Sequence, residues 1–301
     1  ATETYHDLFY EQESRIKKHQ EKVDRLAIET YQLDESDLPE ESLHNNWVSV
    51  TGFPVDPSSA RSFIAKDLCS NILGRLFGRF WIIPSEVKER DPFDPLPVPK
   101  IDLDLTNLSL KDGKLKSLLT QGIAPIGQYF NHSAVDVLSD IVADLYPGSV
   151  GLLDEVLAEL NSDSLNQYFT KPSAFFDYHL SQYSGSSRIA PVYLPLSSTS
   201  GNFTVWLFFQ KLSRATLFSV LNDVIDPTLK VIDEQVLHVK GSNSADEAKL
   251  SSLLDEIRDF RDSIQEILST GFNCDINDGV VITAAPLRKL FKHSGWRKEL
   301  E

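Results

Sequence analysis

The feature of this sequence that most constrains its fold is a long helical pattern of apolar residues between 244 and 270. Apolar residues recur there at spacings of three and four, which gathers them on one face of a helix, while Asp, Glu and Arg occupy the other face. The apolar members are Leu250, Leu253, Leu254, Ile257, Phe260, Ile264, Ile267 and Leu268. Such a face must be buried against another element, so the fold has to supply a partner for it.

The preceding helical pattern, residues 213–238, is the natural partner. Only the short segment Lys240 to Asn243 separates the two patterns, and short connections join helices that pack as antiparallel neighbours. The sequence therefore predicts a helical hairpin. Asp226-Pro227 interrupts the first helix, because proline either kinks a helix or starts it afresh with the residue before it as a cap.

Residues 189–209 have the character of strands instead. Two runs rich in β-branched and aromatic residues, 189–194 and 203–209, flank the polar segment 197–202 (SSTSGN), which reads as a hairpin connection. Together with the helical patterns, these runs predict an α+β fold that is predominantly α-helical, with a small antiparallel sheet and a helical hairpin.

The first third of the chain is helical and then rich in proline. Residues 3–31 predict one long helix, either packed on a core or forming a coiled coil with a partner. A second helix is expected over 57–81, where Gly74 and Gly78 suggest tight packing against another backbone.

The segment 84–100 marks the expected boundary between domains. Its prolines lack N–H donors and restrict their neighbours, which indicates an extended linker. We therefore expect an N-terminal helical segment at 1–83, this proline-rich linker, and a C-terminal α+β domain with the helical hairpin at 101–301.

Composition limits the classes of function. The net charge of −15 argues against a free-standing nucleic-acid-binding module, because phosphate neutralisation supplies most non-specific affinity. Cys69 and Cys274 lie far apart without a metal-ligand pattern, which fits a reducing cytoplasm. No segment is long and apolar enough to span a bilayer and no secretory signal opens the chain, so we expect a cytoplasmic protein without a membrane partner. The absence of methionine indicates a fragment of a longer chain, or modified methionines left out of the sequence.

No catalytic motif is recognisable. The segment 91–94 (DPFD) is superficially similar to the Asp-Pro-Pro-Tyr motif of amino-group methylation, but it lacks the second proline and the aromatic residue that would stack on a base. The histidines do not form a His-Glu-x-x-His pattern, and no Gly-rich turn follows a strand. We therefore expect no catalytic, cofactor-binding or metal-binding residues in this chain.

Several short segments nevertheless form a distinctive pattern along the chain. They are 73–79 (LGRLFGR), 183–193 (YSGSSRIAPVY), 200–207 (SGNFTVWL), 221–223 (LND), 277–282 (NDGVVI), 285–287 (APL) and 296–300 (WRKEL). This pattern resembles the C-terminal region of PglX-like adenine-specific DNA methyltransferases of the BREX phage-exclusion systems, and of related restriction-modification methylases.

The resemblance implies a parent enzyme that transfers a methyl group from S-adenosylmethionine to N6 of an adenine extruded from duplex DNA. The catalytic Asn-Pro-Pro-Tyr motif and the cofactor-binding turn of that family lie upstream of this region, and neither occurs in this chain. The resemblance therefore implies a non-catalytic region for DNA recognition or scaffolding, with S-adenosylmethionine as a cofactor of the full-length enzyme only and DNA as a partner in the context of that enzyme.

The basic residues beside the strands are the candidates for contacting DNA. Arg188 precedes the first strand, and Lys211 and Arg214 follow the second. Arginine and lysine at these places either contact phosphates and groove edges or form ordinary solvated surface. If they read DNA, we expect them to line one face together with the 197–202 loop. The basic segment 288–298 is open to the same two interpretations.

A function of another class also fits. The alternative is a protein-interaction module whose long helices dock other proteins of a defence system. The acidic total favours this interpretation, while the resemblance favours DNA recognition.

Overall fold

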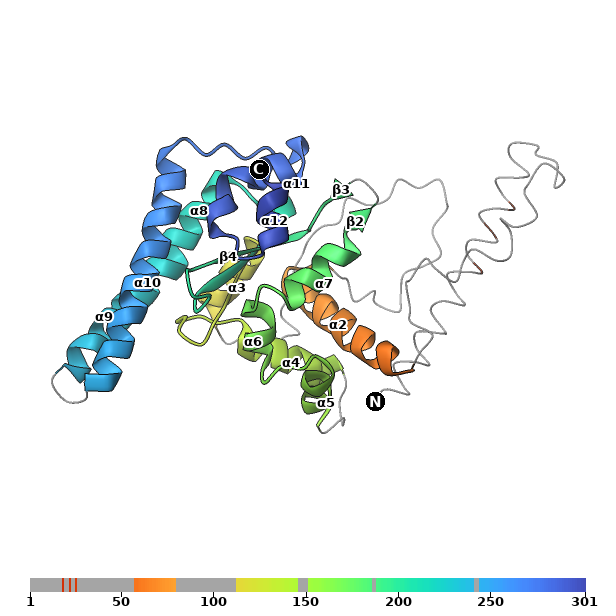
Figure 1. The fold of residues 1–301 in the computed structure, drawn as a ribbon, viewed down its shortest axis with the longest axis horizontal. Helices are drawn as coiled ribbons and strands as arrows, with labels where there is room; N and C mark the ends of the chain where they lie inside the picture. The colour runs from red at the N-terminus through yellow and green to blue at the C-terminus, as the bar shows by residue number, and fades with distance from the viewer. Residues whose placement is uncertain are drawn as a thin grey trace. The chain divides into compact units, whose positions relative to one another are not determined.

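The computed structural model (Figure 1) describes residues 57–79, 112–145, 151–185, 188–240 and 244–301, and the single positions 18, 22 and 25. The chain groups into two compact units, which are residues 1–65 with 149–159, and residues 66–148 with 160–301. Positions 18, 22 and 25 are helical, as expected, but the rest of the 3–31 helix lies outside the described residues. The expected linker at 84–100 lies outside them as well.

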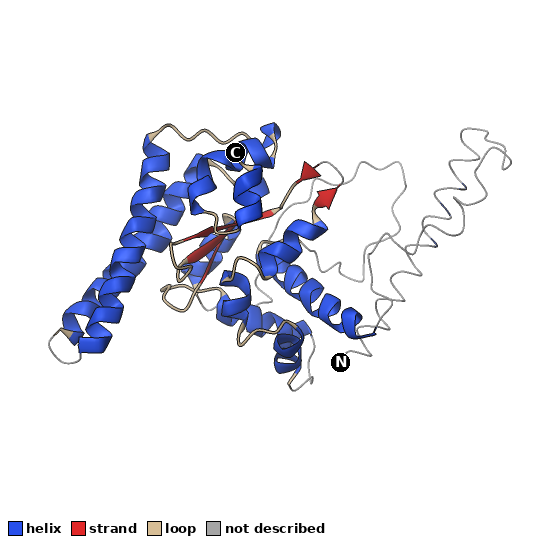
Figure 2. Cartoon of the chain, in the orientation of Figure 1, coloured by secondary structure: helices blue, strands red, loops and turns tan. Residues whose placement is uncertain are grey.

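Helices make up most of the described chain (Figure 2). The α-helices are α2 (Pro57–Leu76), α3 (Gly113–Thr120), α4 (Val135–Leu145), α5 (Leu152–Glu159), α6 (Leu165–Thr170), α7 (Phe175–Gln182), α8 (Arg214–Ser219), α9 (Asp226–Val239), α10 (Ser244–Ser269), α11 (Val280–Ala284) and α12 (Ser294–Glu299). Short 3-10 segments are η3 (Phe209–Lys211), η5 (Ile276–Asp278) and η6 (Ala285–Leu290), and η4 (Val220–Ile225) is π-helical.

The second unit is built around a three-stranded antiparallel sheet. Its strands are β1 (Ile123–Ile126), β4 (Tyr193–Ser197) and β5 (Thr204–Phe208), in the order β1-β5-β4. The prolines of the sheet, Pro125 and Pro195, lie on the edge strands β1 and β4, where a missing N–H does not break the ladder. A separate pair consists of β2 (Ser184–Gly185) and β3 (Arg188–Ile189).

The β4–β5 hairpin confirms the strand pair that the sequence predicts. Tyr193 pairs with Phe208 at one end of the hairpin and Ser197 with Thr204 at the other, and Gly201 adopts a φ of +87° in the connecting loop. Strand β1 was not predicted. Every residue of β1, β4 and β5 is buried, so both faces of this small sheet are covered by helices and loops.

The helical hairpin is also confirmed. Figure 1 shows α9 and α10 running side by side, joined through residues 241–243, and the apolar face of α10 is buried from Leu253 to Leu268. The chain stays helical from Arg214 to Val239, because the π-helical turn η4 leads directly into α9 and both Ile225 and Asp226 have right-handed helical dihedrals. Pro227 therefore stands in the first turn of α9 directly behind a π-helical turn, and a fresh start with Asp226 as its cap is not observed. Nε of Arg261 on α10 donates to Oδ1 of Asp226 at 2.7 Å, which ties the two helices together beside Pro227.

Helix α2 ends earlier than expected, and Gly78 has a different role. Gly78 adopts a φ of +68°, and the N–H of Arg79 donates to the Gly74 carbonyl at 2.8 Å, which is how a glycine terminates a helix. Gly78 thus meets a backbone requirement for a left-handed residue, while its packing against another backbone stays a prediction.

These elements confirm a predominantly helical α+β fold with a small antiparallel sheet. Within the described ranges, no helix combines the length and the apolarity that a membrane span requires.

Replacing Ile257 by Asp tests the role of the α10 face. Ile257 has no exposed surface, so the substitution places an unpaired carboxylate in the core and should lower the free energy of unfolding by about 3–5 kcal/mol. Urea denaturation measures the change. The matched control is Ser252→Asp on the exposed side of the same helix, which should leave stability nearly unchanged. Equal effects of the two substitutions would contradict the packing described here.

Candidate nucleic-acid interface

Segments that lie far apart in the sequence meet at Arg79. Nη1 of Arg79 donates to the Tyr193 hydroxyl at 3.3 Å across 114 residues of sequence. The guanidinium carbon lies 5.2 Å from the centre of the Tyr183 ring and 5.7 Å from that of Tyr193, a range in which a cation is attracted to an aromatic face. Phe77 of the same early segment stacks on Tyr193 with ring centres 5.4 Å apart. The 73–79 and 183–193 segments therefore form one cluster.

His179 on α7 forms the centre of this cluster. Its Nε2 accepts hydrogen bonds from the backbone N–H groups of Val192 and Tyr193 at 3.0 and 3.1 Å, and its ring stacks on Tyr193 with centres 4.8 Å apart. Burial, together with the smaller effect of the nearby charge of Arg79, lowers the pKa of His179 to about 3. The imidazole is thus neutral at ordinary pH and acts as an acceptor that positions the start of β4.

The C-terminal segment joins the same core through α7. Trp296 of α12 is completely buried and meets Phe176 edge-on with ring centres 6.4 Å apart. Phe176 in turn contacts Trp206 of β5 at 5.9 Å, and the indole N–H of Trp206 donates to the Phe169 carbonyl at 3.1 Å. The 200–207 and 296–300 segments are thereby connected by one run of aromatic contacts.

The 197–202 loop is fastened to α10 by one carboxylate. Glu256 accepts hydrogen bonds from the Ser198 hydroxyl, from the Ser200 backbone N–H at 2.9 Å and from the Asn202 amide at 2.9 Å. Burial alone would raise the pKa of Glu256, but these hydrogen bonds outweigh it and lower the pKa below its usual value. The loop therefore carries a fixed negative charge, which is unfavourable beside a DNA phosphate.

Lys211 and Arg214, two of the predicted DNA-contacting residues, also make bonds within the protein. The Lys211 ammonium donates to the Thr120 carbonyl at 2.8 Å, and burial lowers its pKa. Arg214 donates to the Leu268 carbonyl at 3.3 Å and lies 5.8 Å from the centre of the Phe218 ring. Each side chain keeps further N–H donors, since lysine has three and arginine five. The backbone of Arg188 lies in β3 opposite Gly185, while its side chain lies outside the described part of the structure.

Lys211 does not lie beside the 197–202 loop, with which we expected it to share a face. The loop lies at the end of the hairpin where Ser197 pairs with Thr204. There the Asn202 carbonyl oxygen would lie 3.0 Å from a Cβ added at Gly127. Lys211 lies beyond the other end, where a Cβ on Gly122 would stand 2.9 Å from its side chain. The five residues of β5 separate the two ends, and a strand extends by about 3.3 Å per residue. This separation follows from the hairpin itself, because Lys211 comes after the end of β5 that lies away from the loop.

The basic segment 288–298 is partly neutralised. Arg288 pairs with Glu301, and Nε2 of His293 contacts Asp177 of α7 at 3.0 Å. Arg297 and Lys298 on α12 are exposed. Among the described residues, no group of three or more His, Cys, Asp or Glu side chains is arranged to hold a metal ion.

In comparisons with known proteins, the chain matches no protein-family model and no curated protein sequence. The resemblance noted above therefore rests on the quoted segments alone.

The neutrality of His179 makes the fold sensitive to acid. Its ordinary pKa is 6.5, whereas the folded value is about 3, so below pH 6.5 the unfolded chain binds a proton that the folded chain excludes. The free energy of unfolding should consequently fall as pH decreases from 6.5 towards 3, by up to about 1.4 kcal/mol per pH unit from this group. Urea titrations at pH 7 and pH 5 measure the loss.

The matched variants are His179→Gln, which keeps an acceptor without titrating, and His238→Gln at an exposed position on α9. The first should reduce the pH dependence and the second should leave it as in the parent. If His179→Gln retained the parent's full acid sensitivity, carboxylates elsewhere would be its source.

Proposed function

We propose that this chain is the C-terminal, non-catalytic region of an adenine-N6 DNA methyltransferase of the PglX-like type, serving DNA recognition and scaffolding. The parent enzyme would act in restriction-modification or phage defence and would carry its catalytic and S-adenosylmethionine-binding parts upstream. DNA is the partner in the context of that enzyme.

One observation supports this proposal above others. Four of the segments that carry the resemblance are joined by contacts: 73–79 meets 183–193 through Arg79 and Tyr193, and 200–207 is linked to 296–300 through the intervening Phe176. Segments that determine a fold are expected to pack against one another, whereas chance similarities scattered along a chain need not contact each other. The pattern thus describes one packed core rather than several unrelated stretches.

Arg188, Lys211 and Arg214 are the proposed DNA-contacting residues within this region. Lys211 and Arg214 follow the Phe208 end of the hairpin, and Arg188 precedes Tyr193 at the same end. The remaining N–H donors of Lys211 and Arg214 suit phosphate oxygens, and Arg188 adds a third cation ahead of the hairpin. The net charge of −15 would repel a duplex elsewhere on the chain, which restricts how DNA can dock.

A protein-docking function is the second candidate, supported by the tip of the helical hairpin. Leu237 near the end of α9 is 64% exposed, and a large apolar side chain on a projecting hairpin suits a protein contact. Other proteins of the defence system would then be the partners.

The isolated chain should bind no S-adenosylmethionine and transfer no methyl group to DNA. The reason is that the sequence contains neither the Gly-rich cofactor turn nor the catalytic tetrapeptide of the family. Isothermal titration calorimetry with the cofactor and a methyl-transfer assay on duplex DNA measure both properties. Saturable cofactor binding by the chain would contradict the assignment as a non-catalytic region.

The double substitution Arg188→Ala with Arg214→Ala tests DNA recognition in the full-length enzyme. It should weaken duplex binding and reduce the slope of log K against log salt by about 2, because two fewer phosphates are neutralised and fewer counterions are released. Binding titrations at several salt concentrations measure the slope.

The matched control is Lys230→Ala with Lys240→Ala, which removes two exposed charges from α9 and its C-terminal cap and should leave the slope as it is. An unchanged slope in the arginine variant would favour the docking function. In that case Leu237→Asp should abolish binding to the partner protein while DNA methylation persists.

A further inference from the structure

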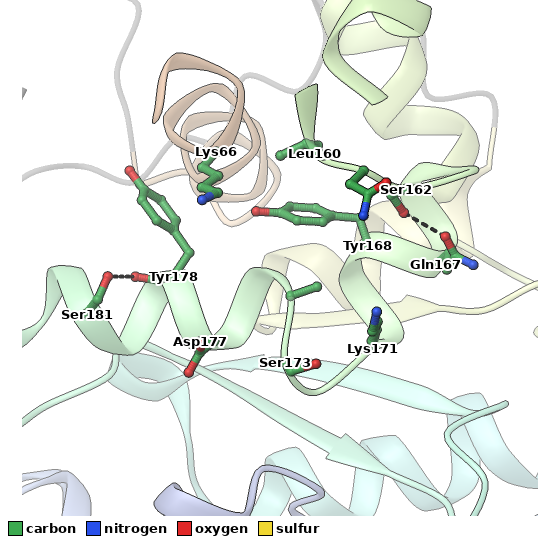
Figure 3. A pocket seen from close by; sticks show the side chains of 12 residues that line it. Lys66, Leu160, Ser162, Gln167, Tyr168, Lys171, Ser173, Asp177, Tyr178 and Ser181 are labelled. Atoms are coloured by element: carbon green, nitrogen blue, oxygen red, sulfur yellow. Dashed lines mark hydrogen bonds between the residues drawn. The ribbon is translucent and has the colours of Figure 1, made fainter. Parts of the chain in front are cut away.

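The second unit contains a cavity of about 410 Å³ between residues of α2, α6 and α7 (Figure 3). Its lining is mostly polar and includes Lys66 from α2, Tyr168 from α6, Lys171 just after α6, and Ser173 and Asp177 at the start of α7. The volume falls in the range of about 300–1,000 Å³ that is usual for small-molecule sites. None of these residues belongs to the proposed DNA contacts.

The Tyr168 hydroxyl is the first indication of a ligand. Tyr168 is only 3% exposed, and its ring packs on Phe169 and Phe175 with centres 5.7 and 6.0 Å away. Its hydroxyl is buried and has no hydrogen-bond partner among the described residues. Burial raises the pKa of Tyr168, so the hydroxyl stays protonated and can donate. A buried donor without an acceptor is unfavourable, which is explained if a ligand supplies the acceptor.

The charges around the cavity indicate what that acceptor is. Figure 3 shows the Tyr168 hydroxyl and the Lys66 ammonium pointing toward one another, and Lys171 adds a second ammonium from the adjoining turn. Asp177 is the one carboxylate among the described lining residues, and it is engaged by His293 at 3.0 Å. A chain with a net charge of −15 therefore has a locally cationic cavity here.

We propose that this cavity binds the phosphate group of a phosphate ester, with Lys66, Lys171 and the Tyr168 hydroxyl as its donors. Lysines are compact point charges suited to an anionic tetrahedral group, whereas planar carboxylates are matched best by the arginine fork. The Ser173 hydroxyl lines the same cavity and can add a donor. The phosphate can belong to a free mononucleotide or to a nucleic-acid backbone. This inference does not depend on the proposed function.

Calorimetric titration of the whole chain tests the proposal with three ligands and one control. The ligands are inorganic phosphate, adenosine 5′-monophosphate and a short DNA duplex, and uncharged adenosine is the control. Phosphate and the monophosphate should bind saturably, and adenosine should not. Lys171→Gln should weaken binding about tenfold, as expected for the loss of one charge-assisted hydrogen bond, whereas Lys240→Gln at the α9 C-terminal cap should have no effect.

Tyr168→Phe separates a ligand-binding role from a structural one. Because its hydroxyl has no partner among the described residues, removing it should not lower the melting temperature, yet it should weaken phosphate binding several-fold. Binding of the monophosphate that depends on Lys171 identifies a free phosphate ester. Binding of the duplex alone, with the same dependence on Lys171, identifies a backbone phosphate. If none of the three ligands binds at millimolar concentration, or if Lys171→Gln and Tyr168→Phe bind as the parent does, the proposal is wrong.

Discussion

The structure depends on the complete burial of a short strand, β5. Val205, Trp206 and Leu207 have no exposed surface, and neither do their partners in the flanking strands, Ala124 and Leu194. A sheet with both faces buried must be covered on both sides, which is why so small a sheet can organise so many helices. The indole N–H of Trp206, the largest residue of β5, is buried as well, and it is satisfied because it donates a hydrogen bond to the Phe169 carbonyl. The aromatic cluster of α6 and α7 follows from this requirement, since those rings surround Trp206.

The polar groups at the edges of this core act mainly as positioning elements. His179 orders the backbone at the start of β4, and Glu256 holds the loop that joins β4 to β5. Each of these side chains accepts hydrogen bonds from more than one N–H or O–H group. Removing either one would therefore leave several donors without an acceptor. The hairpin is thereby fixed at both ends, at one by a neutral ring and at the other by a carboxylate.

Charge separates the surfaces of the second unit. Carboxylates fasten the loop and pair along α10, as Arg261 with Asp226 shows. Cationic side chains also lie close together at two places, Lys66 and Lys171 around the cavity and Arg297 and Lys298 on α12. In an acidic chain, such local concentrations of positive charge are where an anion can approach without strong repulsion. The two proposals concern different sites, and their outcomes can be distinguished experimentally.

The sequence by itself determined the elements whose signal is local. The spacing of Leu253, Ile257 and Ile264 identifies the buried face of α10, Pro227 marks the first turn of α9, and the strand runs identify β4 and β5. Strand β1 escaped prediction because four residues, IAPI, carry too short a pattern to be distinguished from a buried loop. The tertiary structure alone decided which side chains meet. That Arg79 lies over Tyr183, that Glu256 accepts from the distant 198–202 loop, and that Tyr168 and Lys171 line a cavity with Lys66 are contacts between residues with no fixed spacing. Such contacts arise from the packing of whole elements, and periodicity along a chain carries no information about them.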